Sequence, residues 1–244
     1  MSASLGSLFR RDPAGFLKRA LLKVCVGPFR YGRGESFDPS RFWKDRYSKY
    51  GLSLKGSGDE GFSEAENRAM YDKAAASLLE LAGKEGVDFA GKSVLDIGCG
   101  TGYYTALMES RGVAAYTGVD VTDVLFAEHR KRFPRFEFRL ADAARDRLEG
   151  RYDVVLLLDV IQNIVTEENL AGVLASARQA LAPGGVLLVA PVALQSRRTM
   201  YYMRYWTLKD IERGLAGLRP GPMLPFRDDR IACFRARTPD GGAT

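Results

Sequence analysis

The chain has 244 residues, of which 46% are hydrophobic and 27% are charged, and its formal net charge is +6. This length and composition are typical of one large α/β domain with additions, and they argue against a disordered or fibrous protein. Three cysteines far apart in the sequence argue against a disulfide framework, and a single histidine leaves no usual zinc ligand set. We therefore expect a cytoplasmic protein without a bound metal.

The positive charge is concentrated in the N-terminal arm, residues 1–35, which holds seven basic and two acidic residues. Since the remainder of the chain is nearly neutral, we expect no nucleic-acid partner. Residues 13–26 fit a helix with one apolar arc, too short and too charged to span a bilayer. The plainer interpretation is a helix that docks on the domain or covers the active site. The alternative is peripheral contact of residues 10–35 with an anionic membrane surface.

Residues 36–91 are expected to form a helical cap or a substrate-side segment. Within them, Ser63-Glu-Ala-Glu66 has the pattern of a capping box, in which a serine and a glutamate satisfy the first backbone N–H groups of a helix. Met70, Ala74 and Leu78 then follow at helical spacing until Gly83. The sequence therefore predicts a helix over residues 64–82.

After residue 92 the pattern changes to short apolar runs that alternate with amphipathic ones. The predicted strands are 93–97, 115–119, 136–140, 152–158, 186–192 and 231–234, and the predicted helices are 103–110, 124–133 and 167–181. Several strands are apolar throughout, as strands covered on both faces must be. The alternation predicts a Rossmann-like, doubly wound and mostly parallel sheet over residues 92–244.

A glycine-rich loop follows the first of these strands. Gly98, Gly100 and Gly102 allow positive backbone φ angles and bring the main chain close to a ligand. A dinucleotide-binding loop would place Gly or Ala at position 103, where its third glycine packs helix on strand, but the chain has Tyr103. This spacing argues against an NAD-dependent oxidoreductase, which remains an alternative.

The segment Val94-Leu-Asp-Ile-Gly-Cys-Gly-Thr-Gly resembles the first motif of class I S-adenosylmethionine (SAM)-dependent methyltransferases. That motif is an acidic strand end, matched by Asp96, followed by a GxGxG loop. The resemblance covers roughly residues 92–192 and includes the Pro183-Gly-Gly turn before the fifth strand. It implies SAM as the cofactor, with Asp96, Gly98, Gly100 and Gly102 among the residues that bind it.

The resemblance carries further cofactor positions onto later strand ends. Asp120 with Val121 matches the position at which the family binds the ribose hydroxyls, and a carboxylate can accept two such donors. Asp142 with the Ala143 backbone matches the adenine position. Asp159 ends the fourth strand, where the methionine end of the cofactor and the acceptor are expected to meet.

The expected catalytic groups are Asp159 and Asn163. Many small-molecule members of the family have a histidine shortly after the fourth strand, and this chain has Val160-Ile-Gln-Asn163 instead. Asn163 cannot take a proton at neutral pH, so it either orients an acceptor or caps the next helix. The chain's one histidine, His129, lies among Arg130, Lys131 and Arg132, and we expect it at the surface.

Two segments rich in aromatic and basic residues are candidates for binding the acceptor. One surrounds Tyr47, and the other contains Arg198, Tyr201 and Tyr202 in a predicted lid over residues 193–222. The alternative is that both segments pack on the core, with their arginines extended to solvent.

The sequence thus predicts methyl transfer from SAM to a small-molecule acceptor, with an oxygen of a glycan, a lipid-linked compound or a secondary metabolite as the first choice. The alternatives are N-methylation of a small molecule and a non-catalytic SAM-binding or membrane-docked regulatory protein. The motifs of nucleic-acid methyltransferases do not follow the fourth strand. The sequence does not indicate the acceptor's identity or the oligomeric state.

Overall fold

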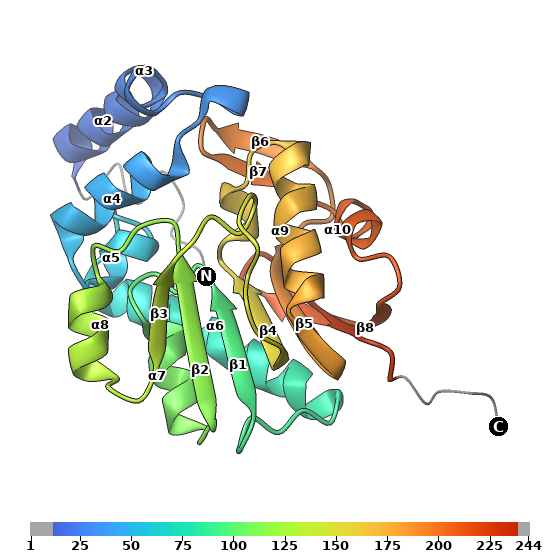
Figure 1. The fold of residues 1–244 in the computed structure, drawn as a ribbon. Helices are drawn as coiled ribbons and strands as arrows, with labels where there is room; N and C mark the ends of the chain where they lie inside the picture. The colour runs from blue at the N-terminus through green and yellow to red at the C-terminus, as the bar shows by residue number, and fades with distance from the viewer. Residues whose placement is uncertain (1–11, 239–244) are drawn as a thin grey trace.

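A seven-stranded sheet forms the centre of the molecule in the computed structural model, which describes residues 12–238 (Figure 1). The strand order is β3-β2-β1-β4-β5-β9-β8, parallel from β3 to β5 and antiparallel for β9 and β8. The strands are β1 (Ser93–Ile97), β2 (Ala115–Asp120), β3 (Glu137–Leu140), β4 (Tyr152–Leu158), β5 (Leu181–Val192), β8 (Arg219–Phe226) and β9 (Asp229–Arg235). The strand order reverses between β1 and β4, as in a doubly wound fold. The predicted fold class is confirmed.

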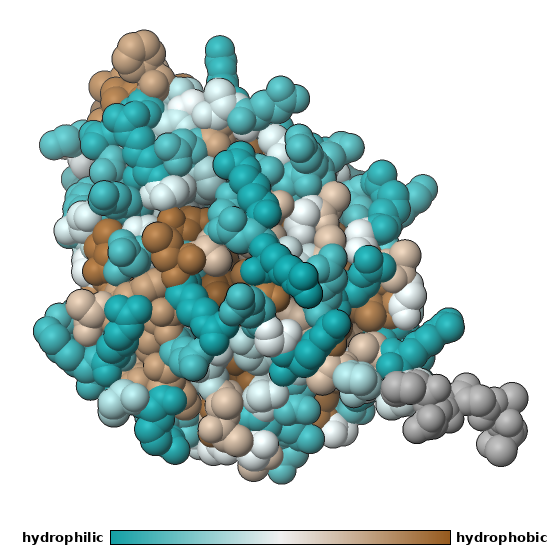
Figure 2. Space-filling view, viewed as in Figure 1, coloured by the Kyte–Doolittle hydropathy of each residue, from teal (hydrophilic) through white to brown (hydrophobic). Residues whose placement is uncertain are grey.

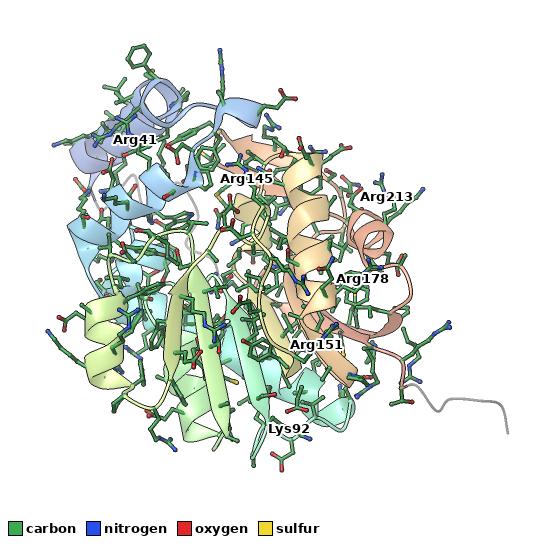
Figure 3. All side chains as sticks on the ribbon, viewed as in Figure 1. Arg41, Lys92, Arg145, Arg151, Arg178 and Arg213 are labelled. Atoms are coloured by element: carbon green, nitrogen blue, oxygen red, sulfur yellow. The ribbon has the colours of Figure 1, made fainter. Side chains whose placement is uncertain are left out.

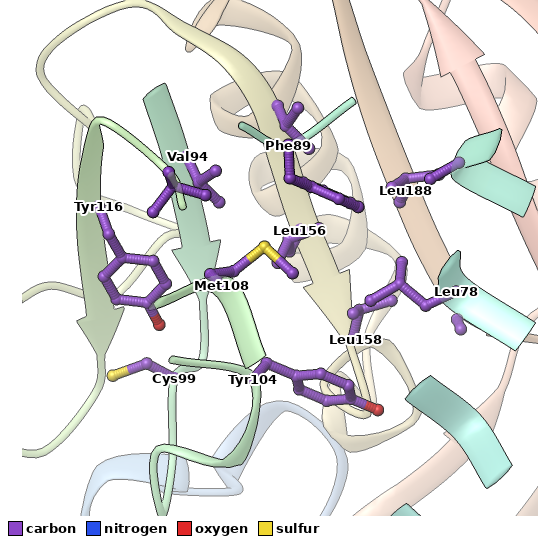
Figure 4. Close-up of a cluster of buried hydrophobic side chains, with 14 of the residues drawn as sticks. Leu78, Phe89, Val94, Cys99, Tyr104, Met108, Tyr116, Leu156, Leu158 and Leu188 are labelled. Atoms are coloured by element: carbon purple, nitrogen blue, oxygen red, sulfur yellow. The ribbon is translucent and has the colours of Figure 1, made fainter. Parts of the chain in front are cut away.

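Helices cover both faces of the sheet because successive side chains of a buried strand point to opposite faces. Val94, Leu156 and Leu188 face one layer, and Figure 4 shows these side chains with Leu78 and Met108. Their neighbours Leu95, Val155 and Leu187 face the other layer. The first layer contains α6 (Glu64–Lys84), α7 (Tyr103–Ser110) and α8 (Phe126–Arg132), and the second contains α9 (Glu167–Gln179) and α10 (Leu208–Gly214).

The capping box begins α6 as predicted. The Ser63 side chain accepts from the Glu66 backbone N–H, and the Glu66 side chain accepts from the Ser63 N–H. Residues of α6 such as Leu78 and Leu81 are fully buried in the core. Residues 36–91 were predicted as a helical cap or substrate-side segment, and within them α6 belongs to the core that packs against the sheet.

Most predicted boundaries lie within two residues of those in the structure, and the start of β5 differs by more. The helix predicted to reach residue 181 ends at Gln179, and β5 begins at Leu181 rather than 186. Tyr152 of β4 pairs with Leu181, and Val154 pairs with Val186. Residues 182–185, which include Pro183-Gly-Gly, therefore lie outside the regular pairing with β4.

The N-terminal segment is helical and lies over one end of the sheet (Figure 1). It comprises α2 (Pro13–Leu21), a π-helical turn (Leu22–Val26), α3 (Gly27–Tyr31), a 3-10 turn (Gly34–Ser36), α4 (Pro39–Tyr50) and α5 (Leu54–Ser57). The basic residues Arg10 and Arg11 of the predicted arm lie outside the described residues. Across residues 12–238, none of the helices has both the length and the hydropathy that a bilayer span requires.

Within residues 193–222 the structure has a hairpin of β6 (Arg197–Met200) and β7 (Met203–Tyr205), which the sequence pattern did not indicate. Trp206, 1% exposed, donates from its indole N–H to the Ile164 carbonyl at 2.9 Å. Tyr202 packs with Phe37 and Phe42 in a small apolar cluster. The hairpin is thus attached both to the sheet domain and to the N-terminal helices.

Candidate functional site

A cavity lies at the carboxyl ends of β1, β2 and β4, beneath α4 and α5, and holds about 1040 Å³ of empty space including its opening to solvent. This is the edge at which doubly wound folds bind ligands. Figure 3 shows both edges of the sheet: Lys92 lies just before β1 at the opposite edge, and Arg145 lies after β3 on the cavity's side. The glycine loop, the strand-end carboxylates and several aromatic rings line the cavity.

The glycine loop packs too closely for side chains. Gly98 and Gly100 line the cavity with φ angles of 81° and 51°. A Cβ at Gly98 would lie 2.2 Å from Val160 Cγ2. Gly102, with a φ of 80°, does not line the cavity, and a Cβ there would lie 2.8 Å from His129 Cε1. Gly102 is therefore required for packing behind the loop.

His129 is fully buried, so the prediction of a surface position is wrong. Its Nε2 lies 2.8 Å from the Gly100 carbonyl, and its ring packs 5.0 Å from that of Phe138. Burial lowers the pKa of His129, so the neutral ring supports the loop from behind. Phe126, His129 and Phe133 share the buried side of α8, whereas the basic neighbours of His129 lie on its flanks. The i, i+3, i+7 spacing is the signal that sequence reasoning missed.

Asp120 lines the cavity at the end of β2. Its carboxylate accepts from the backbone N–H groups of Gly100 at 3.0 Å and Thr122 at 3.3 Å. Burial raises the pKa of Asp120 to about 6, although these N–H donors act against the rise. The neighbouring Val121, Asp142 and Ala143 also line the cavity, as the sequence predicted for a ribose and adenine site.

Asp96 lies behind the loop and does not line the cavity. Its side chain is 1% exposed, and Oδ2 accepts from the Tyr116 hydroxyl at 2.7 Å. Oδ1 has no hydrogen-bond partner, and burial raises the pKa of this carboxyl to about 7. The structure therefore places Asp96 as a support for β1 and β2 rather than beside a ligand.

Asp159 is held by a cation that sequence reasoning did not find. Its carboxylate accepts from Arg227 at 2.6 Å and from the Tyr104 hydroxyl at 3.1 Å. The Arg227 guanidinium also lies 4.7 Å from the centre of the Tyr71 ring. Burial raises the pKa of Asp159, and Arg227 counteracts that rise. Both Asp159 and Arg227 have positive φ angles, 59° and 54°, which are uncommon for residues with a side chain and require a surrounding structure that enforces them.

Asn163 lines the cavity and donates from its side-chain amide to the Asp159 carbonyl at 3.2 Å. The next helix, α9, is capped instead by Thr166, whose side chain accepts from the Asn169 N–H. Of the two roles considered for Asn163, the helix cap is therefore wrong.

The N-terminal helices close the cavity from above, and we call residues 38–58 the cap. Two hydrogen bonds attach the cap to the cofactor side of the sheet: Ser40 donates to the Val121 carbonyl at 2.9 Å, and Ser57 lies 2.9 Å from Thr101. Tyr47, predicted to bind the acceptor, lines the cavity. Further aromatic lining residues are Phe37, Trp43, Tyr71, Tyr103 and Tyr104.

The other predicted acceptor residues lie outside the cavity lining. Arg198 donates to the Val165 carbonyl at 3.0 Å. Tyr202 stacks on Phe42 with ring centres 4.8 Å apart, and Tyr201 packs edge-on against Tyr202 at 4.9 Å. These contacts correspond to the alternative in which the segment packs on the protein. The sequence carries no signal for the pairing of Tyr202 with Phe42 because the two residues are separated by more than 150 positions.

A family model described as a methyltransferase domain matches residues 66–217. The chain is 34% identical to the demethylmenaquinone methyltransferase of Tropheryma whipplei over 124 residues, which cover 50% of this chain and 47% of that protein. It is 29% identical to the ubiquinone biosynthesis O-methyltransferase of Pseudomonas aeruginosa over 135 residues, covering 53% and 56%. The chain thus matches about half the length of these curated relatives.

Solved structures show the same fold. The magnesium protoporphyrin IX methyltransferase of Synechocystis PCC 6803, with SAM bound, superposes with a TM-score of 0.61 at 21% identity, covering 82% of this chain and 98% of that one. The N-methyltransferase NodS of Bradyrhizobium japonicum, with S-adenosylhomocysteine (SAH) bound, gives 0.59 at 16% identity, covering 78% and 98%. The chain belongs to the class I SAM-dependent methyltransferase family.

The lining of the cavity fits SAM by its chemistry. Asp120 presents a buried carboxylate to the cavity, suited to hydroxyl donors. Gly98 and Gly100 line the cavity without side chains, so a ligand can approach the backbone there closely. Asp159 lines the other end, where Arg227 pairs with its carboxylate. Among residues 12–238 no cluster of His, Cys, Asp and Glu has the arrangement of a metal site.

Proposed function

We propose that this chain transfers the methyl group of SAM to an oxygen atom of a small molecule, and that this oxygen is a readily ionised phenol or carboxyl group. The observation that carries the proposal is the ion pair between Asp159 and Arg227. Asp159 is the only carboxylate at the acceptor end of the described lining, and this pair prevents it from acting as a free proton acceptor. The proposal deepens the family assignment by stating the chemistry of the acceptor.

SAM supplies a methyl group on a positively charged sulfur, which is a good leaving group. Asp120 would accept the ribose hydroxyls, and Asp142 with the Ala143 backbone would face the adenine. The loop at Gly98 and Gly100 would lie along the methionine part. These contacts hold the electrophile in one orientation, and orientation alone contributes on the order of 7 to 11 kcal/mol over a bimolecular reference.

At the acceptor end, the described lining contains no free general base. It has no histidine or lysine, and burial raises the pKa values of the Cys99 thiol and of the Tyr47, Tyr71 and Tyr104 hydroxyls, so these groups stay protonated. An efficient base would need a pKa near the working pH and an open position. An acceptor oxygen that is already ionised in solution needs no such group.

The lining beyond the cofactor residues favours a flat or apolar acceptor. Trp43, Tyr47, Tyr71, Tyr103 and Tyr104 line the cavity together with Asp159, and the Tyr104 hydroxyl donates to Asp159. Aromatic rings contribute large contact areas with little loss of conformational freedom. Two of the relatives have names that indicate a small acceptor: the ubiquinone biosynthesis O-methyltransferase and the trans-aconitate 2-methyltransferase of Methylobacterium radiotolerans.

Incubation of the purified protein with isotopically labelled SAM and a metabolite extract, followed by mass spectrometry, tests the proposal. Labelled products are then treated with mild base, which hydrolyses carboxyl methyl esters but leaves phenyl methyl ethers and methylamines intact. Labelled esters or ethers are the expected result. Label found only on nitrogen would contradict the proposed acceptor chemistry, and no labelled product, with SAM binding intact, would favour a non-catalytic SAM-binding protein.

A further inference from the structure

The N-terminal helices expose an unusual number of large apolar side chains. Between residues 12 and 238, nine such side chains are exposed, and six of them lie within thirteen consecutive positions. We call these six the arm surface: Leu17, Leu21, Leu22, Val24, Val26 and Phe29, with Phe29 95% exposed. In Figure 2, hydrophobic side chains gather at the top of the view, where Figure 1 places α3, next to hydrophilic ones. Clustered apolar exposure of this kind marks an interaction surface.

The arm surface follows from the helical spacing of its residues. Leu17, Leu21 and Val24 stand at i, i+4 and i+7 in α2 and the following π-helical turn. Leu22, Val26 and Phe29 repeat the same spacing on an adjacent stripe. Residues at these intervals share a helix face, so the six side chains form two apolar stripes, which we together call the apolar strip.

The arm is fixed to the rest of the protein by its other side. Gly27 is buried, and a Cβ there would lie 2.5 Å from the Tyr201 ring. Lys23 forms an ion pair with Glu60 at 3.4 Å, and Arg30 forms one with Asp45 at 2.6 Å. These contacts tie the arm to the cap and to the β6–β7 hairpin. The apolar strip therefore has a set orientation and faces away from the protein.

The basic residues around the strip indicate which kind of partner it fits. Residues 12–33 contain five basic residues and one acidic residue, and Lys18 and Arg33 are exposed. A second copy of the chain would bring the same positive charge against itself, which is unfavourable. A nucleic acid would match the charge but not the apolar strip. An anionic lipid bilayer matches both, because apolar side chains enter the acyl boundary while lysine and arginine contact the headgroups.

We propose that the arm surface docks this protein peripherally on an anionic membrane. Docking through α2 and α3 also brings the attached cap, which covers the cavity, close to the bilayer. The proposal is independent of the acceptor chemistry, since it depends only on the arm.

Flotation of the full-length protein with vesicles tests the docking. We expect binding to vesicles of phosphatidylcholine with phosphatidylglycerol, weaker binding as salt rises, and little binding to phosphatidylcholine alone. The triple variant Leu17→Ser/Leu21→Ser/Val24→Ser should lower the partition coefficient by at least about tenfold. The matched control is Leu140→Ser/Leu194→Ser, which removes exposed apolar side chains elsewhere and should bind as the native protein does.

A charge variant tests whether the basic residues of the arm contribute to docking. Lys18→Glu/Arg33→Glu should also reduce binding by at least about tenfold at low salt, since it replaces two bases that would contact the anionic headgroups by acids that they repel. The control Lys73→Glu/Lys92→Glu changes the net charge equally at exposed sites outside the arm. SAH calorimetry confirms that each variant is folded. The proposal would be overturned if a variant and its control lost vesicle binding equally, or if the native protein bound neutral vesicles as well as anionic ones. It would also be overturned if the arm mediated a dimer and the protein did not bind vesicles.

Discussion

At the residue scale, the cavity is defined by two carboxylates in different environments. Asp120 accepts only from backbone N–H groups, and burial raises its pKa to about 6. Asp159 is equally enclosed but has Arg227 at 2.6 Å. The first carboxylate remains available to hydroxyl donors, whereas the second is neutralised within the protein. We therefore expect changes at Asp120 to affect cofactor binding, and changes at the Asp159–Arg227 pair to affect stability.

We predict that Asp120→Asn weakens SAH binding by about ten-fold to over a hundred-fold, equivalent to roughly 1.5 to 3 kcal/mol, because a charged acceptor for two hydroxyls is lost. In the native protein, affinity should also fall by about tenfold between pH 7 and pH 5, since hydroxyl donors favour the ionised carboxylate, whose pKa is about 6. Calorimetry across this pH range measures both effects. An unchanged affinity in the folded variant, or the same pH dependence in Asp120→Asn, would contradict the ribose assignment.

We predict that Arg227→Met destabilises the protein by about 3 to 5 kcal/mol at pH 8, because it leaves the buried Asp159 carboxylate without a cation. The pKa of Asp159 should then rise further above its unfolded value. An acid with a raised pKa in the folded state loses stability as pH increases, so the deficit should be smaller at pH 5 than at pH 8.

Chemical denaturation at the two pH values measures this deficit. The matched control is Arg139→Met, which breaks an exposed pair with Glu137 and should change the unfolding free energy by less than about 1 kcal/mol. The double variant Arg227→Met/Asp159→Asn should recover much of the loss. A pH-independent deficit, unaffected by Asp159→Asn, would show that Arg227 acts through packing alone.

At the element scale, Arg46 joins the two helices of the cap. Arg46 of α4 donates to the carbonyls of Gly56, Lys55 and Gly58, and so satisfies the end of the short helix α5. Ser57, within α5, contacts Thr101 of the glycine loop. Arg46 therefore helps to set the position of α5 over the cavity.

We predict that Arg46→Met accelerates SAH dissociation by about tenfold while the protein stays folded, because hydrogen bonds to a charged group are worth about 1.5 to 3 kcal/mol to the cap. Stopped-flow displacement measures the rate. The exposed neighbour Lys44→Met on the same helix serves as the control and should dissociate at the native rate. If the rate in Arg46→Met also stays native, the cap does not gate the cofactor.

At the scale of the whole molecule, stability should depend on pH through Asp96. Its pKa is about 7 in the folded protein, above the ordinary value of 3.8, because burial disfavours the charge. The folded state then binds more protons than the unfolded state between pH 4 and pH 7, so the unfolding free energy decreases as pH rises through that window. The total decrease is on the order of a few kcal/mol, at about 1.36 kcal/mol per pKa unit. Denaturation of the protein without cofactor should show a larger unfolding free energy at pH 5 than at pH 8. If Asp96→Asn leaves the dependence of the unfolding free energy on pH unchanged, Asp96 is not its cause.

Local patterns in the sequence predict the sheet and the residues that line the cavity at its carboxyl edge. Strand positions follow from short apolar runs, and the helix at α6 follows from its capping box, because these signals act between residues close in the chain. Gly98, Gly100, Asp120, Asp142 and Asp159 line the cavity for the same reason: each lies at the end of a strand or within three residues after it, and parallel strands bring their carboxyl ends to one edge.

The surroundings of those residues depend on contacts between distant segments of the chain. The approach of Arg227 to Asp159 depends on the β8–β9 hairpin across 68 positions. The outward direction of the arm surface depends on contacts of Gly27 and Lys23 with segments far along the chain. Such contacts form between distant segments and are selected by packing, so no local pattern in the sequence specifies them.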